Sequence, residues 1–308
     1  MLSREAVTNP PQNPSTITVC APAKINVILR ILDRRADGFH NLWSIMQTVA
    51  LEDEVQISLR ADREGIRLRC DAMDLAADQS NLVYRAAAEV LARAQRSIGL
   101  DIELRKRIPM GAGLGGGSSD AAATIMGLSQ LLQLKWSPAE MADAGQLLGS
   151  DVPFFLFAPS ACVAGRGETV RPVTVEGIRW VVLVNPGFGV NTKWAYQELA
   201  RTRASAGSLS QAQQELDWQS KLNWSQLIAA AENDFEAPVF AAHGKLREIK
   251  QSLQTCGAEI TLLSGSGATV FGLFADEARA RLAQTQFANE RTLKVFVVPT
   301  CSGPLGWR

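Results

Sequence analysis

Metal ligands, disulfide pairs and long apolar runs are scarce in this sequence. Histidine occurs twice, at His40 and His243, and the five cysteines are widely spaced without a C-x-x-C pair. That spacing indicates no zinc site or disulfide framework and favours a reducing compartment. No apolar run approaches the ~20 residues that span a bilayer. Lys plus Arg equals Asp plus Glu at 31 each, which gives no basic surface for nucleic acid or membranes, so we expect neither as a partner.

The length of 308 residues allows two domains with cores of their own. Residues 1–14 are polar and proline-rich and lack the apolar core of a signal peptide, so we predict a disordered tail on a cytoplasmic protein. After about residue 172, a strand-rich region gives way to alternating strands and helices. This shift predicts an N-terminal domain over 15–172 and a C-terminal domain over 173–308.

A glycine-rich run lies between Arg107 and Ala123, with five glycines in the seven residues 111–117. Glycine lets a backbone approach a ligand closely, and Ser118, Ser119 and Asp120 are good residues to cap the helix that we expect over about 119–133. A loop that leads into a helix N-terminus presents free N–H groups and the positive end of the helix dipole. The run therefore predicts a phosphate-binding loop. The alternative, an ordinary surface turn, would need only one or two glycines.

Two better-known phosphate loops do not fit this run. A Walker A loop needs a lysine after its last glycine, where this chain has Ser118. Gly111, Gly113 and Gly116 match G-x-G-x-x-G, but a Rossmann loop should follow a buried parallel strand. The preceding segment, 101–108, alternates polar with mostly apolar residues, which is typical of a half-buried strand.

Strands and helices are expected along the rest of the chain. In the N-terminal half, Ala21-Pro22 should end a strand over 15–20, and a second strand should follow over 23–32. Lys24 and Asn26 then point to the same face of this strand. Lys24 is either a solvated lysine at the edge of the sheet or a charge that Asn26 helps to position. The remaining expected strands are 42–60, 65–70, 101–108, 180–185, 259–263, 269–274 and 293–298, and the expected helices are 80–95, 138–148, 194–199, 236–256 and 276–287.

Four further segments carry specific expectations. Ser137 and Glu140 form a capping-box pattern with a proline at the first helical position. Asp151 lies between a helix end and an apolar segment, where it could cap a turn or take part in chemistry. The polar stretch 201–226 is interpreted as a surface insertion. The turn 264–268 joins two strands and could help to enclose phosphates.

Three ordered motifs resemble those of the GHMP kinases (galactokinase, homoserine, mevalonate and phosphomevalonate kinases). They are 22–26 (PAKIN), 109–119 (PMGAGLGGGSS) and 264–269 (SGSGAT), and the second matches the family's phosphate-binding signature, roughly P-x-G-A/S-G-L-G-S/G-S-S. The likeness covers about 15–300. Two more strings, 34–40 (RRADGFH) and 148–155 (LGSDVPFF), resemble one branch, which phosphorylates the tertiary hydroxyl of a CDP-linked sugar alcohol.

The resemblance implies an α+β fold with a ribosomal-S5-like N-terminal domain and a ferredoxin-like C-terminal domain. It also implies ATP and Mg²⁺, although no metal-binding residues can be assigned, and a monomer or weak homodimer. A homoserine or mevalonate type of GHMP kinase and a non-catalytic, nucleotide-binding member are the alternatives. The two branch-specific strings disfavour the first alternative, and the presence of both Lys24 and Asp151 disfavours the second.

Site residues follow from the same resemblance. Lys24 and Asp151 match the family's catalytic pair. Phe39, where tyrosine is commoner, and Tyr196 would hold the cytosine between them, and His40 would hydrogen-bond its edge. The other residues implied for the sugar substrate are Asn26, Thr192, Gly265, Ser266 and Gly267. The residues implied for ATP are Pro109, Met110, Gly111, Ala112, Gly113, Leu114, Gly115, Gly116, Gly117, Ser118 and Ser119.

Overall fold

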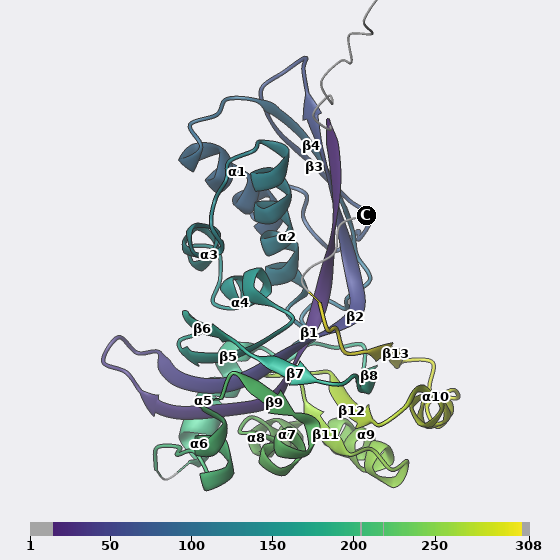
Figure 1. The fold of residues 1–308 in the computed structure, drawn as a ribbon. Helices are drawn as coiled ribbons and strands as arrows, with labels where there is room; N and C mark the ends of the chain where they lie inside the picture. The colour runs from purple at the N-terminus through teal and green to yellow at the C-terminus, as the bar shows by residue number, and fades with distance from the viewer. Residues whose placement is uncertain (1–14, 204, 218, 304–308) are drawn as a thin grey trace, which may run out of the picture.

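The computed structural model describes residues 15–203, 205–217 and 219–303, so the tail expected over 1–14 lies outside the described residues. The described chain forms two halves, and each half consists of a β-sheet with helices packed against it (Figure 1). In one half, helices cover one face of the larger sheet, and in the other half, helices lie beneath the smaller sheet. The α+β fold class expected from the sequence is confirmed.

The larger sheet has the strand order β10-β1-β2-β4-β3, and β5 pairs with both β2 and β6. Neighbouring strands in this sheet are antiparallel except for the parallel pairs β1–β10 and β3–β4. The strands are β1 (Thr16–Arg34), β2 (His40–Arg60), β3 (Gly65–Cys70), β4 (Gly99–Arg105), β5 (Ser160–Gly165), β6 (Thr169–Pro172) and β10 (Glu232–Asn233).

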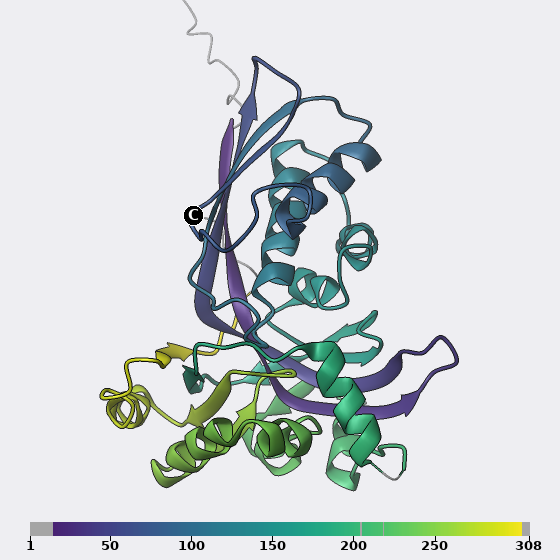
Figure 2. The same cartoon turned by 180° about the vertical axis from the view of Figure 1, so that it is seen from behind.

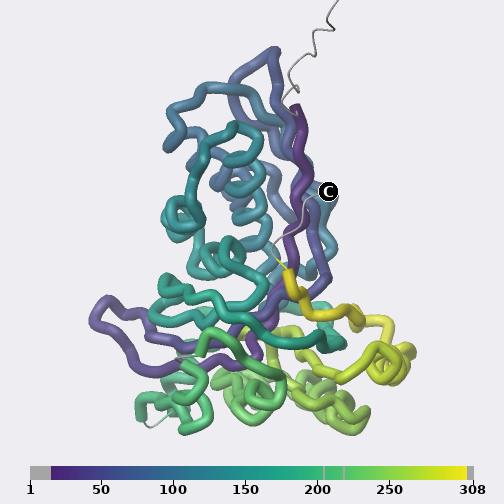
Figure 3. Tube along the Cα trace, viewed as in Figure 1, coloured from purple at the N-terminus to yellow at the C-terminus, as the bar shows by residue number. Residues whose placement is uncertain are grey.

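β1 and β2 form one long hairpin that runs through both halves (Figure 3). The expected break at Ala21-Pro22 is wrong, because β1 continues through it. Proline cannot donate a ladder hydrogen bond and is tolerated at irregularities. The pairing register indeed shifts between Pro22 and Ala23, whose partners are Glu52 and Val49.

Helices of the first half pack on one face of the larger sheet (Figure 2). α1 begins at Leu82 behind its cap Asn81, two residues later than the start expected at 80, and the expected capping box of Ser137 and Glu140 is confirmed at α3. α2 begins three residues earlier than expected, so Ser119 and Asp120 lie within the helix and do not cap it. These helices are α1 (Leu82–Arg93), α2 (Gly116–Leu131), α3 (Pro138–Gln146) and α4 (Val152–Phe157).

The smaller, antiparallel sheet has the order β11-β12-β8-β13. Alternate residues of its strands point to opposite faces of the sheet and pack into two different hydrophobic cores. Val181 and Leu183 pack with residues of β1 and β2, whereas Val182 and Val184 pack with the helices on the opposite face. The strands are β8 (Trp180–Asn185), β11 (Ile260–Leu263), β12 (Val270–Phe274) and β13 (Lys294–Pro299).

The remaining elements correct two expectations. The single helix expected over 236–256 is divided at His243, and 201–226 is more than a surface insertion because Leu216, Leu222 and Trp224 are buried in a core cluster. These elements are α5 (Thr192–Thr202), α6 (Gln211–Asp217), α7 (Trp224–Ala230), α8 (Glu236–Ala242), α9 (Gly244–Thr255) and α10 (Glu277–Thr285), with β7 (Thr174–Glu176) paired to β9 (Lys221–Asn223).

The boundary at about residue 172 stays a prediction. Beyond it, β10 returns to the larger sheet and pairs with β1 at Ile28 and Leu29. Across the described ranges, none of the helices is both long and apolar enough to cross a membrane.

Candidate active site

Lys24 and Asn26 project from the same face of β1 into the interior. Lys24 Nζ donates a 2.6 Å hydrogen bond to Asn26 Oδ1, and Asn26 Nδ2 donates to Ser44 Oγ on β2 at 2.9 Å. Lys24 is 3% exposed, so the alternative of a solvated edge lysine is wrong. The second hydrogen bond fixes the amide so that its oxygen faces the ammonium group.

Asp151 occupies the N-cap position of α4, but its side chain makes no capping hydrogen bond. Its Oδ2 instead lies 3.8 Å from Lys24 Nζ, too far for a hydrogen bond but close enough for an ion pair. Burial lowers the pKa of Lys24, and the charge of Asp151 acts in the opposite direction. The Asp151 side chain remains 34% exposed, so it is open to a ligand on its other side.

The glycine-rich run begins α2 in the manner expected of a phosphate-binding loop. Gly115 is the N-cap residue, with a left-handed φ of 71°, and the first N–H groups of a helix have no partner within it. A Cβ atom on Gly115 would lie 2.9 Å from the Phe155 ring and 3.1 Å from Lys24 Cγ. Only glycine therefore lets this loop lie so close to the lysine.

A second loop, 264–268, and the residue after it are hydrogen-bonded to the backbone of the first. Ser264 Oγ donates to Gly113 O at 2.9 Å, and Thr269 N donates to Ala112 O at 3.1 Å. A Cβ atom on Gly113 would lie only 2.0 Å from Ser264 O. The strand that bears Lys24 joins the same assembly, because Lys24 N donates to Leu114 O at 2.9 Å.

Two cavities flank the glycine-rich loop. The lysine cavity has a volume of about 160 Å³ and the loop cavity one of about 380 Å³, and both are lined by Gly113 and Gly115. Charged and polar groups converge on the lysine cavity from distant segments of the chain. Its polar lining residues include Lys24, Asn26, Asp151, Thr192, Tyr196 and Ser266, and its apolar ones include Leu29, Leu42, Met46 and Phe235.

Most of the residues expected at the site line one of these cavities. Asn26, Thr192, Tyr196, Gly265 and Ser266 line the lysine cavity, and all of 109–118 line the loop cavity. Four expected residues line neither of the two: Phe39, His40, Ser119 and Gly267. Ser119 is fully buried inside α2, and its hydroxyl has no hydrogen-bond partner within the described chain.

The aromatic residues expected to clamp a base are arranged differently from that expectation. The rings of His40 and Tyr196 stack with centroids 5.1 Å apart, and Phe235 contacts Tyr196 edge-on. Phe39 is 56% exposed, and the guanidinium of Arg166 lies 4.5 Å from its ring centroid. Burial and the charge of Asp151 raise the pKa of Tyr196 to about 12, and burial lowers the pKa of His40. Tyr196 therefore faces the cavity as a neutral phenol backed by a ring that is largely uncharged at neutral pH.

Sequence reasoning missed a buried charge cluster at the base of the loop cavity. Lys106 Nζ contacts a carboxylate oxygen of Asp53 and, at 2.6 Å, Asp120 Oδ2. Asp53 Oδ1 also accepts hydrogen bonds from the backbone N–H groups of Arg107 and Ile108, where the glycine-rich run begins. Burial raises the pKa of Asp120 to about 7, against the opposing charge of Lys106. Only the position of Lys106 directly before the run gave any signal in the sequence.

Family models match both halves of the chain. The model of the GHMP kinases N terminal domain matches residues 81–158, and that of the GHMP kinases C terminal domain matches residues 214–291. The fold and the paired loops thus define a GHMP kinase, a class of ATP-dependent enzymes.

Individual relatives place the chain more narrowly. The 4-diphosphocytidyl-2-C-methyl-D-erythritol kinase of Citrifermentans bemidjiense is 40% identical over 275 residues, 89% of this chain and 95% of that protein. The enzyme of the same name from Syntrophus aciditrophicus is 38% identical over 92% of this chain and 98% of its own length. The chain belongs to the 4-diphosphocytidyl-2-C-methyl-D-erythritol kinase family.

One solved structure agrees with this placement, and a second shows the same fold. A crystal structure of 4-(cytidine 5'-diphospho)-2C-methyl-D-erythritol kinase superposes with a TM-score of 0.76 at 29% identity, covering 93% of this chain and all of that one. A homoserine kinase from Cytophaga hutchinsonii gives 0.74 at 21% identity over 100% of this chain and 99% of its own, a likeness that shows the fold alone.

Proposed function

We propose that this enzyme transfers the γ-phosphoryl group of ATP to the tertiary C2 hydroxyl of 4-diphosphocytidyl-2-C-methyl-D-erythritol, a step in the non-mevalonate route to isoprenoid precursors. The observation that carries the proposal is the ion pair of Lys24 and Asp151 in a cavity that shares Gly113 and Gly115 with the phosphate-binding loop. An acceptor in the lysine cavity and a nucleotide in the loop cavity would meet at these two glycines.

The residues of the ion pair suit phosphoryl transfer to an alcohol. A tertiary hydroxyl is crowded and weakly acidic, so positioning and charge stabilisation dominate its reaction. Asp151, which is partly exposed, accepts the proton of the hydroxyl as the new P–O bond forms. Lys24, held by Asn26, stabilises negative charge on the attacking oxygen and on the transferred group. The N–H groups at the start of α2 bind the phosphates.

The aromatic wall of the lysine cavity suits the cytidine end of the acceptor. Tyr196 lines the cavity and stacks on His40, whose ring nitrogens can hydrogen-bond a base edge. The clamp of Phe39 and Tyr196 remains our proposal, and it requires Phe39 to turn towards Tyr196 when the substrate binds.

We also propose that Mg²⁺ accompanies ATP in this reaction. Within the described ranges, His, Cys, Asp and Glu form no group of three or more that could hold a metal ion. Such surroundings suit an ion that is held mainly by nucleotide phosphates and water, so no residue of the chain is assigned to it. When bound, Mg²⁺ would neutralise charge on the β- and γ-phosphates.

A substrate panel tests the proposed function. Purified enzyme, ATP and Mg²⁺ would be incubated separately with the CDP-linked acceptor, homoserine and mevalonate, and the products would be identified by mass spectrometry. We expect phosphorylation of the CDP-linked acceptor alone. Turnover of homoserine or mevalonate without turnover of that acceptor would overturn the assignment. We also propose a cytoplasmic monomer or weak homodimer, which sedimentation of the purified protein and fractionation of cells would test.

A further inference from the structure

The segment 232–236, here called the brace, lies between β1 and the second loop, 264–268. It contains Glu232, Asn233, Asp234, Phe235 and Glu236, and its first two residues form β10. We propose that Asn233 is a positioning residue, which holds the second loop against Lys24 and the glycine-rich loop. This inference rests on the proposed function for its substrate but concerns a residue to which that function assigns no role.

The carboxamide of Asn233 is fully used in holding the backbone. Its Nδ2 donates to Leu263 O at 2.7 Å and to Gly265 O at 2.9 Å, while its Oδ1 accepts from Phe235 N at 2.9 Å. The residue is 4% exposed, so water does not readily replace these bonds. One side chain thus fixes both the end of β11 and the first glycine of the second loop.

Gly265 is the point at which this support reaches the site. It lines the lysine cavity and has a left-handed φ of 57°. A Cβ atom there would lie 3.1 Å from Gly113 O and 3.3 Å from Lys24 Nζ. A displacement of this backbone by even a few tenths of an ångström would therefore alter the space around the lysine.

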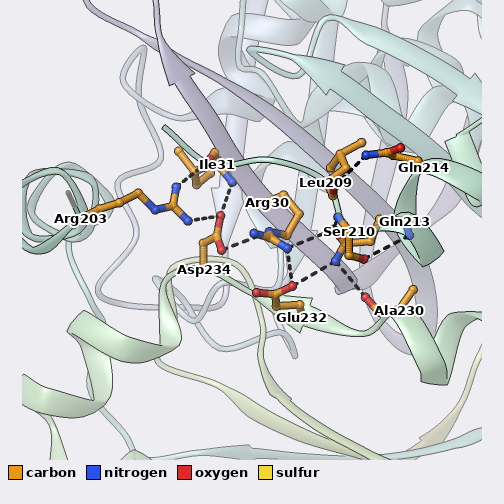
Figure 4. A network of polar contacts seen from close by, with 10 residues as sticks. All are labelled: Arg30, Ile31, Arg203, Leu209, Ser210, Gln213, Gln214, Ala230, Glu232 and Asp234. Atoms are coloured by element: carbon orange, nitrogen blue, oxygen red, sulfur yellow. Dashed lines mark hydrogen bonds and ion pairs between the residues drawn. The ribbon is translucent and has the colours of Figure 1, made fainter. Parts of the chain in front are cut away.

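The other end of the brace is anchored to the strand that bears Lys24. Asp234 N donates to Leu29 O at 3.0 Å, and Asp234 Oδ2 accepts from Ile31 N at 2.6 Å. The Asp234 carboxylate also lies between the guanidinium groups of Arg30 and Arg203, at 3.2 and 2.8 Å (Figure 4). Because the brace is fixed on β1, Asn233 sets the distance between β1 and the second loop.

An amide is required at this position for a chemical reason. Asn233 faces two carbonyl oxygens, so it must donate two hydrogen bonds, whereas an ionised aspartate of the same shape can only accept. In Asn233→Asp the second loop should therefore be pushed away from its support. A protonated aspartate regains one donor, so part of the support should return at low pH.

Gln213 on α6 provides a matched control. Like Asn233, it is a buried carboxamide, and its Nε2 donates to Ala230 O and to Oε2 of Glu232 in the brace (Figure 4). Gln213→Glu is the same change of amide to acid facing two oxygen atoms, and it keeps the oxygen that accepts from Arg30 Nη1 at 3.0 Å. Unlike Asn233, Gln213 has no hydrogen bond to the second loop among the contacts of the described residues.

The experiment compares the two variants with the wild-type enzyme, using the acceptor that the wild type phosphorylates in the substrate panel. We expect Asn233→Asp to lower kcat at least about tenfold at pH 8, and the ratio of its kcat to that of the wild type to rise as the pH falls to 6. Gln213→Glu should lower the melting temperature to a similar degree yet keep kcat within about twofold. Equal kcat losses in the two variants, or a kcat ratio for Asn233→Asp that does not change with pH, would overturn the proposal.

Hydrogen–deuterium exchange supplies a readout that needs no turnover. Peptides that cover 260–270 should exchange faster in Asn233→Asp than in the wild type, and should be unchanged in Gln213→Glu. Unchanged exchange in Asn233→Asp would count against the positioning role whatever the acceptor is. Failure of the substrate panel would instead overturn the proposed acceptor and leave this comparison intact.

Discussion

Replacing Asp151 by asparagine is the most direct test of the proposed chemistry. The substitution keeps the size and shape of the side chain but removes both the proton acceptor and the charge that faces Lys24 at 3.8 Å. Since the Asp151 side chain makes no capping hydrogen bond to α4, the local fold should tolerate the change.

The expected loss can be built from two contributions. Two unit charges at 3.8 Å attract each other by about 4 kcal/mol at an effective dielectric constant of about 20. Because a third of the Asp151 side chain is exposed, solvent screening reduces this attraction to about 2 kcal/mol. If the attraction serves to orient the lysine, its loss corresponds to roughly a thirtyfold fall in rate. Loss of a general base typically costs about 10²–10⁴ in rate. Both contributions come from the same carboxylate and do not simply multiply, so we expect kcat to fall at least about a hundredfold, the lower end for loss of the base alone.

Steady-state release of ADP in the presence of the CDP-linked acceptor measures this effect. Lys24→Ala should cause a comparable loss, whereas Asp143→Asn, on the exposed face of α3, should have none. The KM for ATP should barely change in Asp151→Asn, because the loop cavity does not include Asp151. Near-normal kcat in a folded Asp151→Asn enzyme would falsify the assignment of Asp151 as the base.

Three further predictions concern the two cavities. Tyr196→Ala should lower kcat/KM for the CDP-linked acceptor by roughly ten- to a hundredfold, because base stacking is worth ~1–3 kcal/mol. Tyr196→Phe should leave kcat/KM nearly unchanged. Weaker ATP binding in Tyr196→Ala, with unchanged use of the acceptor, would show that the two cavities are assigned to the wrong ligands. Gly113→Ala should abolish ATP binding measured by calorimetry, since its Cβ would lie 2.0 Å from a carbonyl oxygen, while Gly244→Ala, with open space around it, is the control that should bind normally. Finally, burial raises the pKa of Asp120 to about 7, above the ~3.9 of an unfolded chain. The folded protein therefore holds this proton more tightly, and the stabilisation that protonated Asp120 gives is lost as the pH rises from about 4 to 7. Asp120→Asn should flatten this fall in urea titrations between about pH 4 and 7, and an unchanged slope would contradict it.

Features that depend on local spacing were predictable from the sequence. Period-two spacing put Lys24 and Asn26 on one face of a strand, and they are in fact hydrogen-bonded at 2.6 Å. The capping box at Ser137 and the hairpin around 264–268 follow from short-range turn chemistry in the same way. Each of these patterns involves residues within a few positions of one another, so no tertiary information is needed to interpret them.

Features that depend on tertiary packing were not predictable. The stretch 201–226 is polar and low in apolar residues, which predicts a surface insertion, yet Leu216, Leu222 and Trp224 are buried in a core cluster. The start of α2 was misjudged because serine usually caps a helix from outside it, whereas here Gly115 takes that position and Ser119 is enclosed. In both cases the packing of distant elements overrides the local preference.

The choice between a capping and a chemical role for Asp151 shows why such sites resist sequence reasoning. Position alone favoured both roles equally, because a residue before an apolar helix is often a cap. The two roles are distinguished by the position of Lys24 Nζ, 3.8 Å from the Asp151 carboxylate. That position depends on β1 lying against the glycine-rich loop, where Lys24 N donates to Leu114 O. That arrangement requires close backbone approach at Gly113, Gly115 and Gly265, where a Cβ atom would lie between 2.0 and 3.1 Å from a neighbouring group. The glycines are visible in the sequence, but which segments they allow to meet is determined only by the fold.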